Sequence, residues 1–280
     1  MKFALLTPRW RWIFHTIFEE FQQFINRPEI TFDIIHTREI QKRLRDYDWI
    51  VSPIKFQKTY ENTLFKKELR DRFIGFVGGN ECYDRITDWS IFKHVWILSQ
   101  GLVRPELECT NYFVQPNGVD THLFHPMNLD KEWFVGFIGN AGNPRKRIRD
   151  WFKPICQRAD VSYYLHNGQT HYLPRSALPS LYNRFRCYMN TAMWEGGCNP
   201  ILEAAACGLP IVATDTGFIR DFGDLAFRCH TLQEMVHALV TLKEDADLQR
   251  RMGQRLRRLM VEEWSVEQRA EEWISTVEAL

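Results

Sequence analysis

The stretch that decides the fold is residues 194–217, which read WEGGCNPILEAAACGLPIVATDTG. Asn199 is a good N-cap, and Pro200 then falls on the first helical position, where its missing N–H costs nothing. Gly208 suits the position just after a helix end, and the β-branched run that follows predicts a strand over residues 210–214. We therefore expect a loop, a short helix over residues 200–207 and a strand, which together form one repeat of an α/β sheet.

Two glutamates flank the expected helix start, Glu195 before the loop and Glu203 about one turn into the helix. Amides at the positive end of a helix are a ready site for a phosphate. A carboxylate can accept two hydrogen bonds from vicinal hydroxyls, such as those of a ribose. The stretch predicts a site for a diphosphate flanked by two sugars. A buried βαβ unit with solvated glutamates is the alternative, because a glycine-rich loop before a helix is a weak signal.

The rest of the chain alternates strand-like runs with amphipathic stretches, which predicts parallel sheets covered by helices. The alternation stops near residues 117–130, where turn residues replace periodicity, and then restarts. We therefore expect two successive α/β domains in the 280 residues, with a cleft between them.

Composition excludes several classes of protein. The formal charge is +1, so no overall field favours nucleic acid or an anionic membrane. Seven cysteines, an odd number without a CxxC pair, argue against a zinc ribbon or a disulfide scaffold and predict reduced thiols in a cytoplasmic protein. The first residues, MKFALLTPRWRW, do not read as a signal peptide, and no apolar run reaches membrane-spanning length.

Residues 195–213 closely resemble the donor-site signature of family-4 retaining glycosyltransferases, approximately EGFGLPxLEAMACGxPVVA. The E-x7-E spacing, the LEA core and the CGxPIVA tail agree. Three further segments match in order: QPNGVDTHLFHP, FVGFIGNAGNPRKR and LPSLYNRFRCYMNTAMWEGG. The closing WSVEQRAEEW is also similar to the family's last helix. The resemblance covers about residues 112–273 and implies the α/β fold called GT-B, in which two Rossmann-like domains face a cleft.

The resemblance also implies domain boundaries and a role for each domain. Residues 1–115 would form a small N-terminal Rossmann-like domain for the acceptor, reduced in size for this fold. Residues 116–131 would connect it to a C-terminal domain over residues 132–264 that binds the nucleotide-sugar. A last helix over residues 265–280 would pack back toward the N-terminal domain.

Site residues follow from the same match. Glu203 would bind the ribose hydroxyls and Glu195 the donor sugar. Lys146 fits the family's lysine after the first strand of the domain, whereas Asn140 stands where the family has an arginine, so Arg145 or Arg147 is expected to replace it. The residues expected to face the sugar, the diphosphate or the nucleobase are Gly139, Asn140, Gly197, Cys198, Asn199, Ile201, Leu202 and His166.

The family's chemistry is transfer with retention of anomeric configuration, by a front-face route in which the donor phosphate helps to deprotonate the acceptor. A positive charge near the leaving diphosphate would stabilise its developing charge, which assigns catalytic roles to Lys146 and Arg145 beside Glu195. The alternative is a double displacement with Glu195 as nucleophile. The acidic triplets at residues 46–48 and 245–247 are interpreted as turns or helix ends, so we expect no metal requirement and no tightly bound cofactor.

The N-terminal domain offers weaker candidates for the acceptor side. Arg9 and Trp10 follow the first strand, and Asn80 and Glu81 follow a later one. A solvated helix start is the preferred explanation of the first pair, and a plain turn that of the second. The acceptor stays open among a glycan, a lipid-linked sugar, a protein and DNA, with no integral membrane segment expected.

The sequence thus predicts an enzyme that transfers a hexose from a UDP- or GDP-sugar to an acceptor hydroxyl. A non-catalytic subunit that binds sugar nucleotides is the alternative, because Asn140 departs from the family pattern. An epimerase of sugar nucleotides is a third possibility, although the sequence shows no clear acid and base pair for it.

Overall fold

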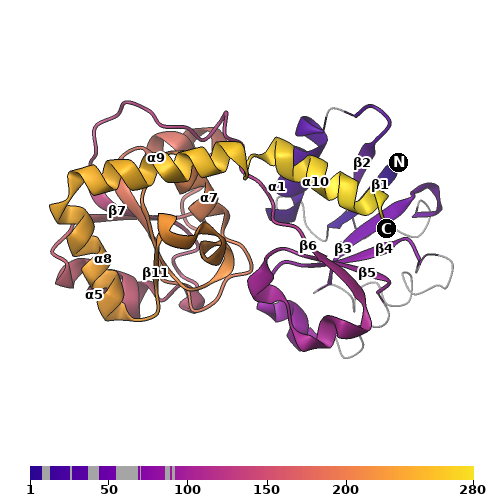
Figure 1. Ribbon diagram of the computed structural model, residues 1–280, viewed down its shortest axis with the longest axis horizontal. Helices are drawn as coiled ribbons and strands as arrows, with labels where there is room; N and C mark the ends of the chain where they lie inside the picture. Colours follow the sequence, from indigo (N-terminus) through magenta and orange to yellow (C-terminus); the bar gives the residue numbers. More distant parts are fainter. Residues whose placement is uncertain are drawn as a thin grey trace. The chain divides into compact units, whose positions relative to one another are not determined.

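The computed structural model describes residues 1–7, 13–25, 27–36, 44–54, 69, 71–85, 89 and 92–280. The chain forms two compact units (Figure 1). Unit 1 contains residues 1–118 and 266–280, and unit 2 contains residues 119–265. Each unit holds one parallel sheet, which confirms the predicted α/β fold. No helix in the described ranges combines the length and the apolar character that a bilayer-spanning segment needs.

Unit 1 has a six-stranded sheet in the order β2-β1-β3-β4-β5-β6. Its strands are β1 (Lys2–Thr7), β2 (Thr31–His36), β3 (Trp49–Pro53), β4 (Phe73–Val77), β5 (His94–Ile97) and β6 (Asn111–Val114). Among the residues of unit 1 that the structure describes, the helices are α1 (Ile13–Phe24) and α10 (Val266–Glu278), and 3-10 turns lie at Leu44–Asp46, Asn80–Arg85, Gln100–Leu102 and Pro105–Cys109.

The last helix of the chain, α10, belongs to the core of unit 1 and packs on α1 (Figure 1). Trp273 of α10 has no exposed surface. Its ring centroid lies 5.1 Å from that of Phe3, 5.7 Å from that of Phe21 and 5.4 Å from that of Trp96. Since a buried aromatic side chain contributes about 1.5–3 kcal/mol or more through burial, α10 is a structural part of this unit.

His94, the first residue of β5, is buried without a hydrogen-bond partner for either ring nitrogen among the described residues. Burial lowers the pKa of this imidazole, and the nearby Lys93 lowers it further. The unfolded chain, with a histidine pKa near 6.5, therefore binds the proton more readily than the folded chain.

The free energy of unfolding is accordingly expected to decrease as pH falls below about 6.5 and through the lower folded pKa, by at most about 1.4 kcal/mol per pH unit. His94→Leu should reduce this dependence, whereas the same change at the exposed His237 should not. Urea denaturation at pH 7.5 and 5.5 measures the effect. An identical pH dependence in both variants and the wild type would contradict it.

Unit 2 has a five-stranded sheet in the order β11-β10-β9-β7-β8. Its strands are β7 (Trp133–Gly139), β8 (Tyr163–Asn167), β9 (Phe185–Asn190), β10 (Ile211–Thr214) and β11 (Phe227–Cys229). Its α-helices are α5 (Lys153–Arg158), α6 (Leu178–Tyr182), α7 (Asn199–Ala206), α8 (Leu232–Glu244) and α9 (Ala246–Glu262). Shorter turns are Pro144–Lys146, Ile148–Phe152, Arg175–Ala177 and Gly217–Leu225.

Alternate residues of the central strands of unit 2 form its core. Phe137 of β7 and Met189 of β9 are buried in one cluster with Ile155 of α5 and Leu239 of α8. Helix α7 contacts β9 and β10, and α9 packs against α7. The chain order of the strands reverses between β7 and β9. In open parallel sheets, ligands bind beyond the carboxyl ends of the strands at such a reversal.

The predicted N-cap of α7 is wrong by one residue. Cys198 occupies the cap position without a side-chain hydrogen bond, and Asn199 is the first helical residue. The other end agrees with the prediction, because Gly208 follows the helix with a φ of 75°. Pro200, although second rather than first in the helix, still lies where its missing N–H removes no intrahelical bond.

Candidate functional site

The loops that follow β7 and β9 meet at the strand-order reversal of unit 2. The first loop carries Arg145 and Lys146, and the second carries Glu195. Two hydrogen bonds join them: the amide of Met193 donates to the carbonyl of Arg145 over 2.9 Å, and the Thr191 hydroxyl donates to the carbonyl of Lys146 over 2.6 Å. The second loop is therefore fixed to the backbone of the first.

The turn that presents the basic side chains has a defined geometry. Asn143 caps the 3-10 turn Pro144–Lys146 by accepting from the amide of Arg145 over 3.0 Å. Arg147 then adopts a left-handed conformation, with a φ of 50°, which costs a non-glycine residue about 1 kcal/mol. Its guanidinium offsets this cost by donating to the carbonyls of Thr191 (2.7 Å) and Ala192 (3.2 Å) and by stacking on Trp151.

Glu195 forms ion pairs with both preceding basic residues. Its Oε2 lies 2.5 Å from Nη1 of Arg145, and its Oε1 accepts from Nζ of Lys146. The side chains of Glu195, Lys146 and Arg145 are 7%, 11% and 22% exposed. Arg145 also donates to the Trp194 carbonyl over 2.6 Å and lies over the Trp194 ring. Because charges so far from water require close partners, this cluster of two cations and one carboxylate is a preorganised electrostatic site.

A third loop closes on Glu195 from β10. Gly217 has a φ of 58°, and a Cβ at this position would lie 3.1 Å from Cβ of Glu195 and 3.2 Å from the carbonyl oxygen of Gly197. A glycine is therefore needed both for the backbone conformation and for the close approach. The loop after β10 therefore packs against the glycine-rich loop that contains Gly197.

Glu203 lies on α7, is 8% exposed, and accepts a hydrogen bond of 2.7 Å from the hydroxyl of Tyr182 in α6. Burial raises the pKa of the Glu203 carboxyl, while the charge of Arg175 and the Tyr182 hydrogen bond act against this rise. Burial also raises the pKa of Tyr182 well above its usual value, so this phenol stays protonated and donates. The hydrogen bond from Tyr182 thus holds the carboxyl group in one orientation, while its pKa stays raised by burial.

One amide at the start of α7 has a partner within the chain. The amide of Ile201 donates to the carbonyl of Cys198 over 2.8 Å, and its expected contact with the diphosphate stays a prediction. The side chains of Ile201 and Leu202 are buried. Burial raises the pKa of the Cys198 thiol to about 12, so this side chain stays a neutral cap residue.

The remaining predicted donor residues lie on the β7 and β8 side of the same edge. Gly139 ends β7, and its carbonyl accepts from the amides of Ala141 (3.1 Å) and Gly168 (3.2 Å). Asn140 accepts from the amide of Gly142 and shapes the loop. His166 pairs with Ile138 in the sheet and is buried, and burial lowers the pKa of its imidazole, which favours the neutral ring.

The predicted acceptor-side residues of unit 1 lie partly outside the residues that the structure describes. Arg9 and Trp10 lie outside the described residues, as do the rest of the residues between β1 and α1. Asn80 and Glu81 begin a 3-10 turn after β4, and the structure describes their backbone alone. The acceptor side therefore stays a prediction.

The acidic triplets behave as the sequence predicted. Asp245 is the N-cap of α9 and accepts from the amide of Leu248 over 2.7 Å. Asp48 accepts from the amide of Lys2 over 2.8 Å. Within the described part of the chain, no group of three or more histidine, cysteine, aspartate or glutamate side chains could hold a metal ion.

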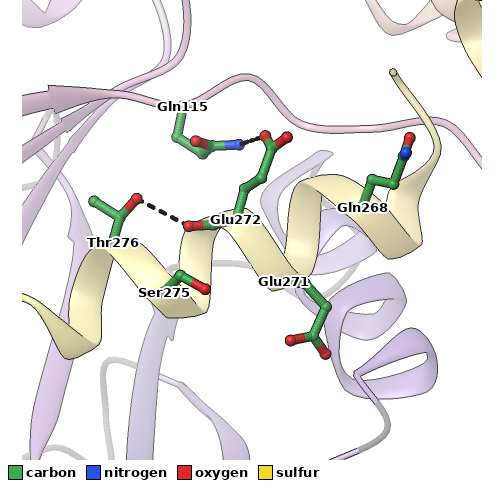
Figure 2. A pocket seen from close by; sticks show the side chains of 6 residues that line it. All are labelled: Gln115, Gln268, Glu271, Glu272, Ser275 and Thr276. Carbon is green, nitrogen blue, oxygen red and sulfur yellow. Dashed lines mark hydrogen bonds between the residues drawn. The ribbon is translucent and has the colours of Figure 1, made fainter. Parts of the chain in front are cut away.

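A separate, wide depression of about 510 Å³ lies on unit 1, along α10 (Figure 2). Figure 2 shows Gln115 facing Glu272, to which its amide donates over 2.9 Å. Six residues line it, none of which is a predicted site residue: Gln115, Gln268, Glu271, Glu272, Ser275 and Thr276.

Sequence reasoning missed Tyr182. It stands in the matching segment LPSLYNRF, where no role was predicted for it, and its side chain has no exposed surface. The signal that could have found it is a phenol with no exposed surface, since a buried hydroxyl requires a partner, and a carboxylate on the next helix is the nearest candidate.

Comparisons with known proteins identify the family and the fold. Residues 140–275 match the family model described as glycosyl transferase-like. The O-antigen chain mannosyltransferase B of Escherichia coli is 35% identical to this chain over 75 residues, which make up 23% of this chain and 20% of that protein. The sequence match to this relative is therefore local.

Solved structures resemble the whole chain. HepE of Anabaena, in complex with UDP and glucose, superposes with a TM-score of 0.75 at 13% identity, and the match covers 100% of both chains. The sucrose-phosphate synthase of Thermosynechococcus elongatus gives 0.70 at 11% identity, over 99% of this chain and 98% of that one. TarM of S. aureus gives 0.70 at 16% identity, over 85% of this chain and 57% of its own length. At these identities the likeness shows the fold, which is GT-B.

Proposed function

We propose that this chain, a glycosyl transferase-like protein with the GT-B fold, transfers a hexose from a nucleoside-diphosphate sugar to an acceptor hydroxyl with retention of configuration. The observation that carries the proposal is the cluster of Arg145, Lys146 and Glu195 at the strand reversal of unit 2. Glu203 on the adjacent helix completes the set of polar groups that a nucleotide-sugar needs.

Each group has a chemical role in the proposal. Lys146 and Arg145 stabilise the negative charge that the diphosphate gains as the sugar leaves, and they can do so without rearranging because their loop is fixed. Glu203 accepts hydrogen bonds from the ribose hydroxyls, and Glu195 accepts them from the donor sugar. The acceptor hydroxyl loses its proton to the donor phosphate in a front-face reaction.

Arg145 is the proposed substitute for the arginine absent at Asn140. Its guanidinium reaches Glu195, whereas that of Arg147 is held by the carbonyls of Thr191 and Ala192 and by Trp151. Because Arg145 restores a second cation, the departure at Asn140 gives no support to a non-catalytic subunit.

UDP-sugars are the first donors to test, because HepE was solved with UDP and with UDP-glucose. All seven cysteines are free, which supports action in a reducing compartment such as the cytoplasm.

Incubation of the chain with a panel of UDP- and GDP-sugars tests the proposal, with release of the nucleoside diphosphate as the measurement. We expect slow release into water with one donor, and a product of the same anomeric configuration when an acceptor is supplied. Binding of a sugar nucleotide without any release, for every donor and acceptor tried, would favour the non-catalytic alternative.

A further inference from the structure

Tyr182 and Glu203 form a hydrogen-bonded pair beside an aromatic cluster, near the charge of Arg175. Tyr182 has no exposed surface, and its ring centroid lies 6.0 Å from that of Phe124, 6.4 Å from that of Phe185 and 6.0 Å from that of Tyr188. Three aromatic neighbours fix the ring and therefore the direction of its hydroxyl. That hydroxyl donates to Oε2 of Glu203.

The pair leaves one carboxylate oxygen for a ligand. Oε1 of Glu203 accepts no hydrogen bond from the described residues, whereas Oε2 is held by Tyr182. The backbone that carries Glu203 is equally fixed, because Ala204, Ala205 and Ala206 have no exposed surface. A glutamate side chain has three rotatable bonds, and the hydrogen bond from Tyr182 restricts their rotation before a ligand arrives. Ligand binding then costs less conformational entropy.

We propose that Tyr182 is the positioning residue of the nucleotide site: it holds Oε2 of Glu203 so that Oε1 meets the ribose hydroxyls of the donor. The inference rests on the proposed function. It assigns the preference for a ribonucleotide over a deoxyribonucleotide to a phenol that itself never touches the ligand.

The hydrogen bond has a second effect, on protonation. Burial raises the pKa of the Glu203 carboxyl. The charge of Arg175 and the hydrogen bond from Tyr182 both counteract this rise. Removal of the hydroxyl therefore raises the pKa of Glu203 further, and the carboxyl takes up a proton at a higher pH than in the wild type. A protonated carboxyl accepts hydrogen bonds less well, so nucleotide binding then weakens earlier as pH falls.

Tyr182→Phe removes the hydroxyl and keeps the ring. Isothermal titration with UDP and GDP, and with the 2′- and 3′-deoxy forms of the one that binds, measures ribose selectivity. We expect affinity for the ribonucleotide to fall about tenfold while affinity for the deoxy forms changes less than twofold. The fall in affinity on lowering the pH should also begin at a higher pH than in the wild type.

Tyr188→Phe is the matched control. Tyr188 is a buried tyrosine of the same unit, and its hydroxyl donates over 3.2 Å to the carbonyl of Ile138 rather than to a carboxylate. Its loss costs a comparable buried hydrogen bond but should leave ribose selectivity and the pH profile of binding unchanged. Incorporation of 3-fluorotyrosine at position 182 strengthens the donor without changing the packing, and should leave selectivity equal to or above that of the wild type.

Glu203→Gln distinguishes the positioning role of Tyr182 from the ribose contact of Glu203. If this variant loses ribose selectivity and Tyr182→Phe retains it with an unchanged pH profile, the positioning role is wrong and the ribose assignment stands. If Glu203→Gln also retains selectivity, the ribose assignment in the proposed function is itself wrong. In a background that carries Glu203→Gln, Tyr182→Phe should have no further effect on selectivity.

Discussion

Lys146→Ala is expected to lower kcat by about 10²- to 10³-fold, the scale for removal of one preorganised group from a developing charge. Affinity for the donor should fall by less than tenfold, because Arg145 and the amides of the loop still contact the diphosphate in the proposed complex. Comparison of single-turnover rates with donor affinity measures the two effects separately.

The control for Lys146→Ala is Arg149→Ala, which removes an exposed cation three residues further on, in the turn Ile148–Phe152. It changes the net charge by the same amount and should leave both kcat and affinity within about twofold of the wild type. Equal losses of kcat and affinity in Lys146→Ala would mean that the lysine contributes only uniform binding, and would contradict a role in the transition state.

Gly253→Ala is expected to destabilise the protein by about 3 kcal/mol, although alanine normally stabilises a helix by about 1 kcal/mol relative to glycine. Gly253 lies on α9 where this helix crosses the end of α7. An added Cβ would lie 2.0 Å from the carbonyl oxygen of Gly208 and 2.9 Å from its carbonyl carbon. Backbone atoms cannot move away as a flexible side chain can, so the two helices must separate.

Urea denaturation of Gly253→Ala checks this expectation, with the exposed neighbour Gln254→Ala as the control that changes the same helix without a contact. The control should change the free energy of unfolding by less than about 0.5 kcal/mol. Separation of the helices should also displace Glu203, which α7 carries, so nucleotide affinity should fall together with stability. If Gly253→Ala is as stable as the wild type, α7 and α9 do not pack as closely as described.

The sequence predicted most of unit 2 because its signals are local. Alternation of strands and helices predicted the parallel sheet, and Gly208 and Pro210 predicted the end of α7. The start of α7 was displaced by one residue, because Asn199 has a cap-forming side chain but the loop geometry places Cys198 at the cap. Cap preferences amount to only about 1 kcal/mol, which the packing of a glycine-rich loop can override.

The arrangement of the candidate site was predicted only in part. The resemblance assigned Arg145, Lys146 and Glu195 to one region, but the pairing of both cations with one carboxylate depends on the left-handed turn at Arg147. A positive φ at an arginine has no sequence signal. Tyr182 was not predicted at all, because a tyrosine in an apolar helix has the same pattern whether its hydroxyl meets a backbone carbonyl or a carboxylate.

The placement of α10 bears on how the protein is made. Unit 2 is one continuous segment, so all of it has left the ribosome before α10 emerges, and it can fold during translation. Unit 1 lacks Trp273 until all of unit 2 has been synthesised, and Phe3, Phe21 and Trp96 lack that aromatic partner until then. The N-terminal part of unit 1 therefore completes its folding only after unit 2 has been made, and until then its apolar surface is a target for chaperones.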